Sequence, residues 1–120
     1  MGAYERARLS VWIDRIGYSN KLFDIIRIDH FRAFDTYWKI PASCPTAIEG
    51  EWIEAPGYEV IDILQEKIPG LNLVAEDLGD LRPEVLTLKD HYHLKGMKVF
   101  LFSVETGGKY ARDISMMWKI

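Results

Sequence analysis

Two acidic residues, Asp29 and Glu76, stand where carboxylates can do chemistry, because each directly follows a short apolar run. In the run 23–34 (FDIIRIDHFRAF), Arg27 and Asp29 are two residues apart, so their side chains share one face if the run is a strand. A guanidinium at that spacing would keep the carboxylate ionised and fix its orientation, as a nucleophilic aspartate requires. The run 71–79 (LNLVAEDLG) repeats this design and delivers Glu76.

Two carboxyl groups at the ends of neighbouring parallel strands favour glycoside chemistry. A retaining reaction of the glycosidase type needs an ionised nucleophile and a protonated acid/base group ~5–5.5 Å apart. Adjacent parallel strands lie ~4.8 Å apart, so Asp29 and Glu76 can meet that requirement. Barrel enzymes of the α/β class build active sites from strand ends in this way. The alternative is that both residues only cap strand-to-helix turns, and spacing alone leaves both interpretations open.

A metal site is a weaker hypothesis. His91 and His93 stand close to Asp90 in a predicted helix, but positions i and i+2 of a helix do not face each other. No third ligand follows at helical spacing. We therefore predict no metal site.

Three aromatic residues fall outside the periodic segments, namely Tyr37, Trp38 and Trp52. Aromatic side chains with an apolar face and a polar tip suit two roles. They could stack against a ring-shaped ligand, or they could anchor a long loop on the core. The sequence leaves these two roles open.

The apolar pattern predicts strands that alternate with helices. We expect helices over 4–17 and 58–68 and a third that opens at Pro83, and strands over 22–28, 71–75 and 97–104. The segment 33–57 has little periodicity, and we expect an ordered loop over a site there. Alternation of this kind predicts right-handed βαβ units and a parallel sheet, so the fold class is α/β.

The bulk composition restricts the partners of the chain. The 120 residues carry a net charge of −3, which gives no electrostatic reason to expect nucleic acid or an anionic membrane as a partner. No apolar run approaches the ~20 residues of a membrane span, and the N-terminus lacks a signal-peptide core. The single cysteine, Cys44, permits no intrachain disulfide, which is compatible with a cytoplasmic location. We predict a single domain over 1–120.

Residues 10–103 resemble the central segment of the 4-alpha-glucanotransferases, also called amylomaltases or disproportionating enzymes. The resemblance rests on the strings IIRIDHFRAFDTYWKIPA, TAIEGEWIEAPG, NLVAEDLGDLRPEV and LKGMKV, and it ends before a divergent tail over 106–120. Members of that family are (β/α)₈-barrel enzymes that cleave an α-1,4 bond and pass the glucan to a 4-hydroxyl group with retention. The resemblance implies a partial (β/α)₈ TIM barrel with about three parallel strands, a maltooligosaccharide substrate and no cofactor.

The same resemblance implies roles for single residues. Asp29 in RIDHF would be the nucleophile, and Glu76 in AEDLG would be the general acid/base. Arg27 would be the arginine beside the nucleophile. The implied substrate-binding residues are Arg27, His30, Asp77 and Glu105.

The chain departs from the family pattern in ways that affect its expected activity. Ala33 stands where the RIDHFRGF motif of the family has Gly. The third catalytic acid of the family lies in a His-Asp motif on a later strand that this chain does not reach, so we expect an incomplete, inactive piece. Two alternatives stay open: a retaining α-glucan hydrolase relative, with water as the acceptor, and a non-catalytic fragment that associates through exposed strand edges.

Overall fold

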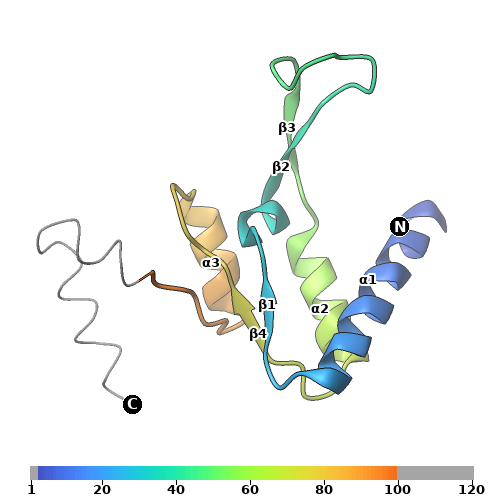
Figure 1. Ribbon diagram of the computed structural model, residues 1–120, viewed down its shortest axis with the longest axis vertical. Helices are drawn as coiled ribbons and strands as arrows, with labels where there is room; N and C mark the ends of the chain where they lie inside the picture. The colour runs from blue at the N-terminus through green and yellow to red at the C-terminus, as the bar shows by residue number, and fades with distance from the viewer. Residues whose placement is uncertain (1–2, 100–120) are drawn as a thin grey trace, which may run out of the picture.

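The computed structural model of the protein describes residues 3–99 (Figure 1). In chain order, its elements are α1 (Ala3–Leu22), β1 (Ile26–Ile28), the 3₁₀ helix η1 (Phe31–Phe34), β2 (Thr36–Lys39), β3 (Glu51–Glu54), α2 (Gly57–Lys67), β4 (Leu73–Ala75) and α3 (Pro83–His91). Strands β1 and β4 form a two-stranded parallel sheet, and β2 and β3 form a separate antiparallel hairpin. The described chain is therefore an α/β structure with few parallel strands, as predicted.

One hydrophobic core lies against one face of the β1–β4 sheet. Its fully packed members are Ile16, Ile28, Phe31, Ile61, Leu64, Ile68, Leu73, Ala75, Val85 and Leu88. Because α1, α2 and α3 all contribute to this one cluster, the three helices pack against the same core as the sheet. Arg27, which alternates with the buried Ile28 along β1, is on the other face and is exposed. The sheet thus has a packed face and an open face.

Helices α2 and α3 form where the apolar spacing predicts them. In α2, Ile61 and Leu64 are almost completely buried. Gly70, just beyond the end of α2, has a φ of 74°, a conformation that glycine adopts without steric cost. In α3, Pro83 lies in the first turn, where a backbone N–H would have no hydrogen-bond partner within the helix, so proline loses nothing by lacking one.

Helix α1 is longer than predicted, and the expected stop at Gly17 is wrong. The helix continues to Leu22, and β1 begins only at Ile26. A glycine inside a helix costs only about 1 kcal/mol relative to alanine, so α1 can continue through Gly17 while its neighbour Ile16 is buried in the core. Although α1 has 20 residues, neither it nor any other helix within residues 3–99 is long and apolar enough to cross a membrane.

The segment 33–57 is ordered, as predicted, but the prediction that it is one loop is wrong. It begins in η1 and then forms the β2–β3 hairpin, which projects away from the core (Figure 1). The two strands are rich in aromatic and β-branched residues, which favour pairing even in short runs. At the base of the hairpin, the Ala55 N–H donates to the Asp35 carbonyl at 2.8 Å. This contact brings the two ends of the segment together.

The third parallel strand was predicted over 97–104. In the structure, a single parallel bridge joins Val74 to Lys95, and the Ala75 N–H donates to the Lys95 carbonyl at 2.8 Å. Residues 97–99 are not part of a strand. The remainder of the predicted strand, and the tail over 106–120, lie outside the described residues.

Candidate active site

Arg27 and Asp29 form the ion pair that their spacing predicts. An Nη atom of Arg27 lies 2.8 Å from a carboxylate oxygen of Asp29. Their side chains are 52% and 73% exposed, so the pair contributes little to stability. Its role is therefore geometric, because a charge-assisted hydrogen bond fixes where the carboxylate lies on the open face.

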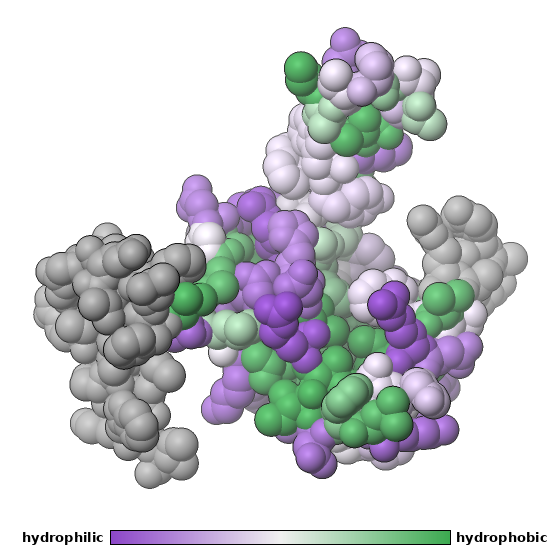
Figure 2. Space-filling model, viewed as in Figure 1, coloured by the Kyte–Doolittle hydropathy of each residue, from purple (hydrophilic) through white to green (hydrophobic). Residues whose placement is uncertain are grey.

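The register of the parallel sheet places Asp29 and Glu76 at the same edge. Ile28 is paired with Ala75, and the Glu76 N–H donates to the Ile28 carbonyl at 2.9 Å. Each acidic residue directly follows one member of that last pair. Figure 2 shows hydrophilic side chains gathered over this end of the sheet and hydrophobic side chains gathered below them. The two carboxyl-bearing residues thus leave neighbouring strands side by side, as the sequence predicted.

The carboxyl group of Glu76 also holds the turn that follows β1. Its oxygens accept hydrogen bonds from the backbone N–H of His30 at 2.9 Å and of Leu78 at 3.1 Å. His30 has a φ of 52°, a left-handed conformation that is uncommon for residues other than glycine. The bond from Glu76 therefore stabilises a turn whose backbone is otherwise unfavourable. No local sequence pattern indicates this contact.

The carboxylate of Asp77 is bound within the protein. One of its carboxylate oxygens accepts from the Lys89 ammonium at 2.6 Å and the other from the Met97 N–H at 2.8 Å. Burial alone would raise the pKa of Asp77, but the hydrogen bonds from Lys89 and Met97 outweigh it, and the pKa lies below its usual value. The known partners of this carboxylate are thus within the protein, while its implied contact with sugar stays a prediction.

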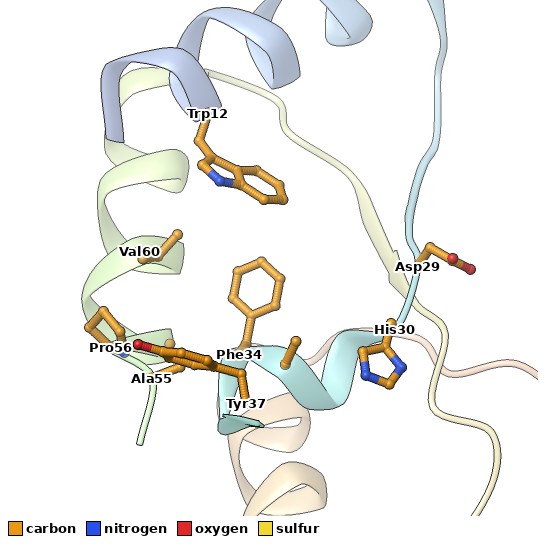
Figure 3. A pocket seen from close by; sticks show the side chains of 10 residues that line it. Trp12, Asp29, His30, Phe34, Tyr37, Ala55, Pro56 and Val60 are labelled. Atoms are coloured by element: carbon orange, nitrogen blue, oxygen red, sulfur yellow. The ribbon is translucent and has the colours of Figure 1, made fainter. Parts of the chain in front are cut away.

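An apolar pocket of about 360 Å³ opens on the helix side of β1. Its lining residues are Trp12, Asp29, His30, Ala33, Phe34, Tyr37, Ala55, Pro56, Gly57 and Val60. Figure 3 shows Asp29 at the rim, with its carboxylate directed away from Trp12 and Phe34. Asp29 thus borders the pocket, although its carboxylate points away from the apolar interior. Sequence patterns did not indicate this pocket, because α1, η1 and α2 form it jointly.

The hairpin tryptophans, the possible metal ligands and Glu105 are the remaining candidates from the sequence. Trp38 and Trp52 pack edge to face on the hairpin, with ring centroids 5.3 Å apart, and neither is among the residues of the hydrophobic core. Arg32 lies over the Trp52 ring at 5.5 Å from its centroid. No cluster of three or more His, Cys, Asp or Glu side chains that could hold a metal ion occurs in the part of the chain that the structure describes. Glu105 lies outside the described residues.

A sequence model of the 4-alpha-glucanotransferase family matches residues 2–116 of this chain. The chain belongs to the 4-alpha-glucanotransferase family. It is 48% identical over 103 residues to the 4-alpha-glucanotransferase of Thermus thermophilus, in a match that covers 86% of this chain and 21% of that protein. It is 46% identical over 92 residues to the 4-alpha-glucanotransferase of Streptococcus pneumoniae serotype 4, in a match that covers 77% of this chain and 18% of that protein. The resemblance inferred from the sequence motifs is confirmed.

A solved structure of the 4-alpha-glucanotransferase family supports the same relationship. The amylomaltase from Streptococcus agalactiae in complex with acarbose superposes on this chain with a TM-score of 0.76 and 33% sequence identity. The match covers 92% of this chain and 22% of that one. The chain thus spans about a fifth of the length of the relatives that it matches.

Proposed function

We propose that this chain supplies the two reacting carboxyl groups of a 4-alpha-glucanotransferase active site, as one part of a (β/α)₈ barrel. The observation that carries the proposal is the β1–β4 register, which places Asp29 and Glu76 at the ends of adjacent parallel strands. The Arg27 ion pair on Asp29 and the family membership support it. In a barrel, the helices cover the outside, and the open face of β1 and β4 would face the interior.

The reaction proceeds in two steps. In the first, Glu76 donates its proton to the glycosidic oxygen, the bond from C1 to that oxygen breaks, and an Asp29 oxygen bonds to C1. The sugar released carries the proton of Glu76 as its new 4-hydroxyl group. In the second, the 4-hydroxyl of an acceptor glucan attacks C1, its proton passes to Glu76, and Asp29 leaves as a carboxylate.

The remaining roles follow from position. His30 directly follows the nucleophile and would bind the sugar, while Arg27 would orient the Asp29 carboxylate. The substrate would be an α-1,4-glucan such as a maltooligosaccharide, with no cofactor, in the cytoplasm. Since the chain spans a fifth of its relatives, the 120 residues alone are expected to lack the third carboxyl of the family and to be inactive.

The test uses a chimera in which residues 10–103 replace the matching segment of the Thermus thermophilus 4-alpha-glucanotransferase. Incubated with maltotriose, the chimera should release glucose and form a ladder of longer glucans. Asp29→Asn and Glu76→Gln should each lower that rate at least about a hundredfold, because they remove the nucleophile and the proton donor. The matched controls Asp24→Asn and Glu66→Gln make the same chemical changes at exposed positions and should retain activity.

Several results would contradict the proposal. One is a chimera with a cooperative melt that produces no ladder. Another is full activity in Asp29→Asn. Release of glucose without longer products would favour the alternative of a hydrolase, in which water replaces the acceptor sugar.

A further inference from the structure

Lys89 on α3 forms a partly buried ion pair beside the proposed acid/base residue. Its ammonium lies 2.6 Å from Asp77, and the two side chains are 16% and 11% exposed. Lys89 lies in the last turn of α3 and has no role in the proposed reaction. A charge-assisted hydrogen bond this short, in a partly buried site, favours one geometry for the Asp77 carboxylate.

The Asp77 carboxylate is confined on its other side as well. Its second oxygen accepts from the Met97 N–H at 2.8 Å. A Cβ atom added to Gly96 would lie 2.7 Å from an Asp77 carboxylate oxygen, which is closer than such atoms pack. Only glycine at position 96 therefore leaves room for this arrangement.

Fixing Asp77 also fixes its two chain neighbours. Glu76 precedes it, and the Leu78 N–H that follows it donates to a Glu76 oxygen at 3.1 Å. If residue 77 moves, the Leu78 amide moves with it, and the Glu76 carboxyl loses one of the two bonds that orient it. Acid catalysis is sensitive to such movements, since a displacement of about 1 Å can cost about a hundredfold in rate.

We propose that Lys89 is the positioning residue of the acid/base carboxyl: through Asp77 it holds the 76–78 backbone, and so it orients Glu76. The inference rests on the proposed function for the role of Glu76. It assigns to Asp77 a task within the protein. It also explains why residue 96 is glycine, because a side chain there would displace the Asp77 carboxylate.

The first experiment measures amide hydrogen exchange in the full 120-residue chain. Lys89→Met keeps the aliphatic stem and removes the ammonium, whereas Lys89→Arg keeps a cation. In Lys89→Met, the Leu78 and Met97 amides should exchange about tenfold faster, while the Leu64 amide of α2 is unchanged, because only the local structure opens. Lys89→Arg should restore most of the protection. Unchanged exchange at Leu78 in Lys89→Met would overturn the proposal.

The second experiment separates positioning from folding in the chimera. Maltotriose needs a proton on its leaving oxygen, but α-maltosyl fluoride does not, since fluoride is a weak base and leaves without one. Lys89→Met should lower the maltotriose rate about 10- to 100-fold and leave the initial burst of fluoride almost unchanged. Gly96→Ala should reproduce this pattern. Lys67→Met, an exposed lysine on α2, is the control and should have no effect on either substrate.

The outcomes distinguish the two proposals. An equal loss with both substrates in Lys89→Met would mean a general structural defect and would refute the positioning role. Full maltotriose activity in Glu76→Gln would refute the proposed function instead. In that case the exchange rate of the Leu78 amide still decides whether Lys89 holds the 76–78 backbone.

Discussion

At the residue scale, the carboxyl group of Glu76 combines a structural contact with its proposed chemistry. Its oxygens accept from the His30 and Leu78 amides, yet a general acid must also carry a proton. Each carboxyl oxygen has two lone pairs, so a lone pair remains for that proton. A glutamine would instead point an NH₂ group at one of the two amides. Glu76→Gln therefore disturbs the turn as well as the chemistry, and the fluoride substrate is needed to tell these effects apart.

The pH dependence of stability tests the state of Asp77. Its pKa is lowered from 3.8 in the folded chain, so its ion pair contributes stability that is complete above the unfolded value. That contribution is lost as the pH falls below 3.8 and through the lower folded value. At pH 7, Asp77→Asn should reduce the free energy of unfolding by about 1–3 kcal/mol, since a hydrogen bond to a charged group is removed.

Urea unfolding at a series of pH values measures this effect. The difference between the unmodified chain and Asp77→Asn should be constant from neutral pH down to about 5 and should shrink below that. Asp24→Asn, at an exposed position, should show no such trend. A difference that grows as the pH falls would contradict the assignment.

The contacts of these residues differ in how far the sequence predicts them. The Arg27–Asp29 pair follows from the parity of a single strand, so spacing alone was sufficient. The bond from Glu76 to the His30 amide depends on a left-handed residue and on two strand ends meeting, which no local pattern encodes. No local pattern predicts the contact between Lys89 and Asp77 either, because Lys89 lies on a separate helix.

At the element scale, two glycines at helical positions differ in whether a larger side chain would fit. A Cβ atom at Gly17 would make ordinary contact with Ile68 at 3.8 Å. At Gly57, the first residue of α2, it would collide with the Phe34 carbonyl and lie 2.9 Å from Leu88. The close approach at Gly57 is what allows α2 to start directly behind η1.

Alanine substitutions measure this difference. Gly17→Ala should raise the free energy of unfolding by about 0.5–1 kcal/mol, because alanine loses less backbone entropy in a helix. Gly57→Ala should lower it by about 1–3 kcal/mol, as expected for overpacking. Thermal and urea unfolding of the two variants provide the comparison. Equal effects of the two substitutions would show that the packing at Gly57 is not as described.

The same elements show where sequence patterns are sufficient. Both bounds of α2 and the start of α3 at Pro83 were predicted to within one residue, because apolar periodicity and proline mark them. The end of α1 was missed because a single glycine costs too little to stop a helix whose neighbouring Ile16 is buried in the core. The β2–β3 hairpin was missed because its strands are short and mostly exposed, so they lack a clear alternation of buried and exposed residues.

At the scale of the whole molecule, one face of the β1–β4 sheet is covered by the hydrophobic core, but the edge of the sheet at β1 is open within the described residues. Within residues 3–99, β1 pairs with β4 alone, so its second edge has no partner strand. Leu22, Phe23 and Ile25, which lead into β1, are 57%, 62% and 57% exposed. An unpaired edge flanked by exposed apolar side chains favours pairing with another chain. Self-association through this edge stays a proposal.

Light scattering of the purified 120-residue chain after size exclusion tests this association. We expect the mean mass to rise with protein concentration, because association buries the exposed residues beside β1. Phe23→Lys and Ile25→Lys should each reduce that rise by placing charge at the edge. Ile48→Lys makes the same change at the hairpin, where Ile48 is 83% exposed, and should leave it unaltered. A monomeric mass at every concentration would contradict the proposal.

The closed base of the β2–β3 hairpin makes this segment a replaceable module. The Asp35 carbonyl and the Ala55 amide meet at 2.8 Å, so the path from η1 to α2 is already closed before the hairpin begins. The hairpin can therefore vary in length or composition without altering how β1 and α2 pack. A recombinant library could exchange this hairpin for other sequences while the strand that carries Asp29 stays in place. The fold thus separates an adaptable appendage from the fixed strands that bear the carboxyl groups.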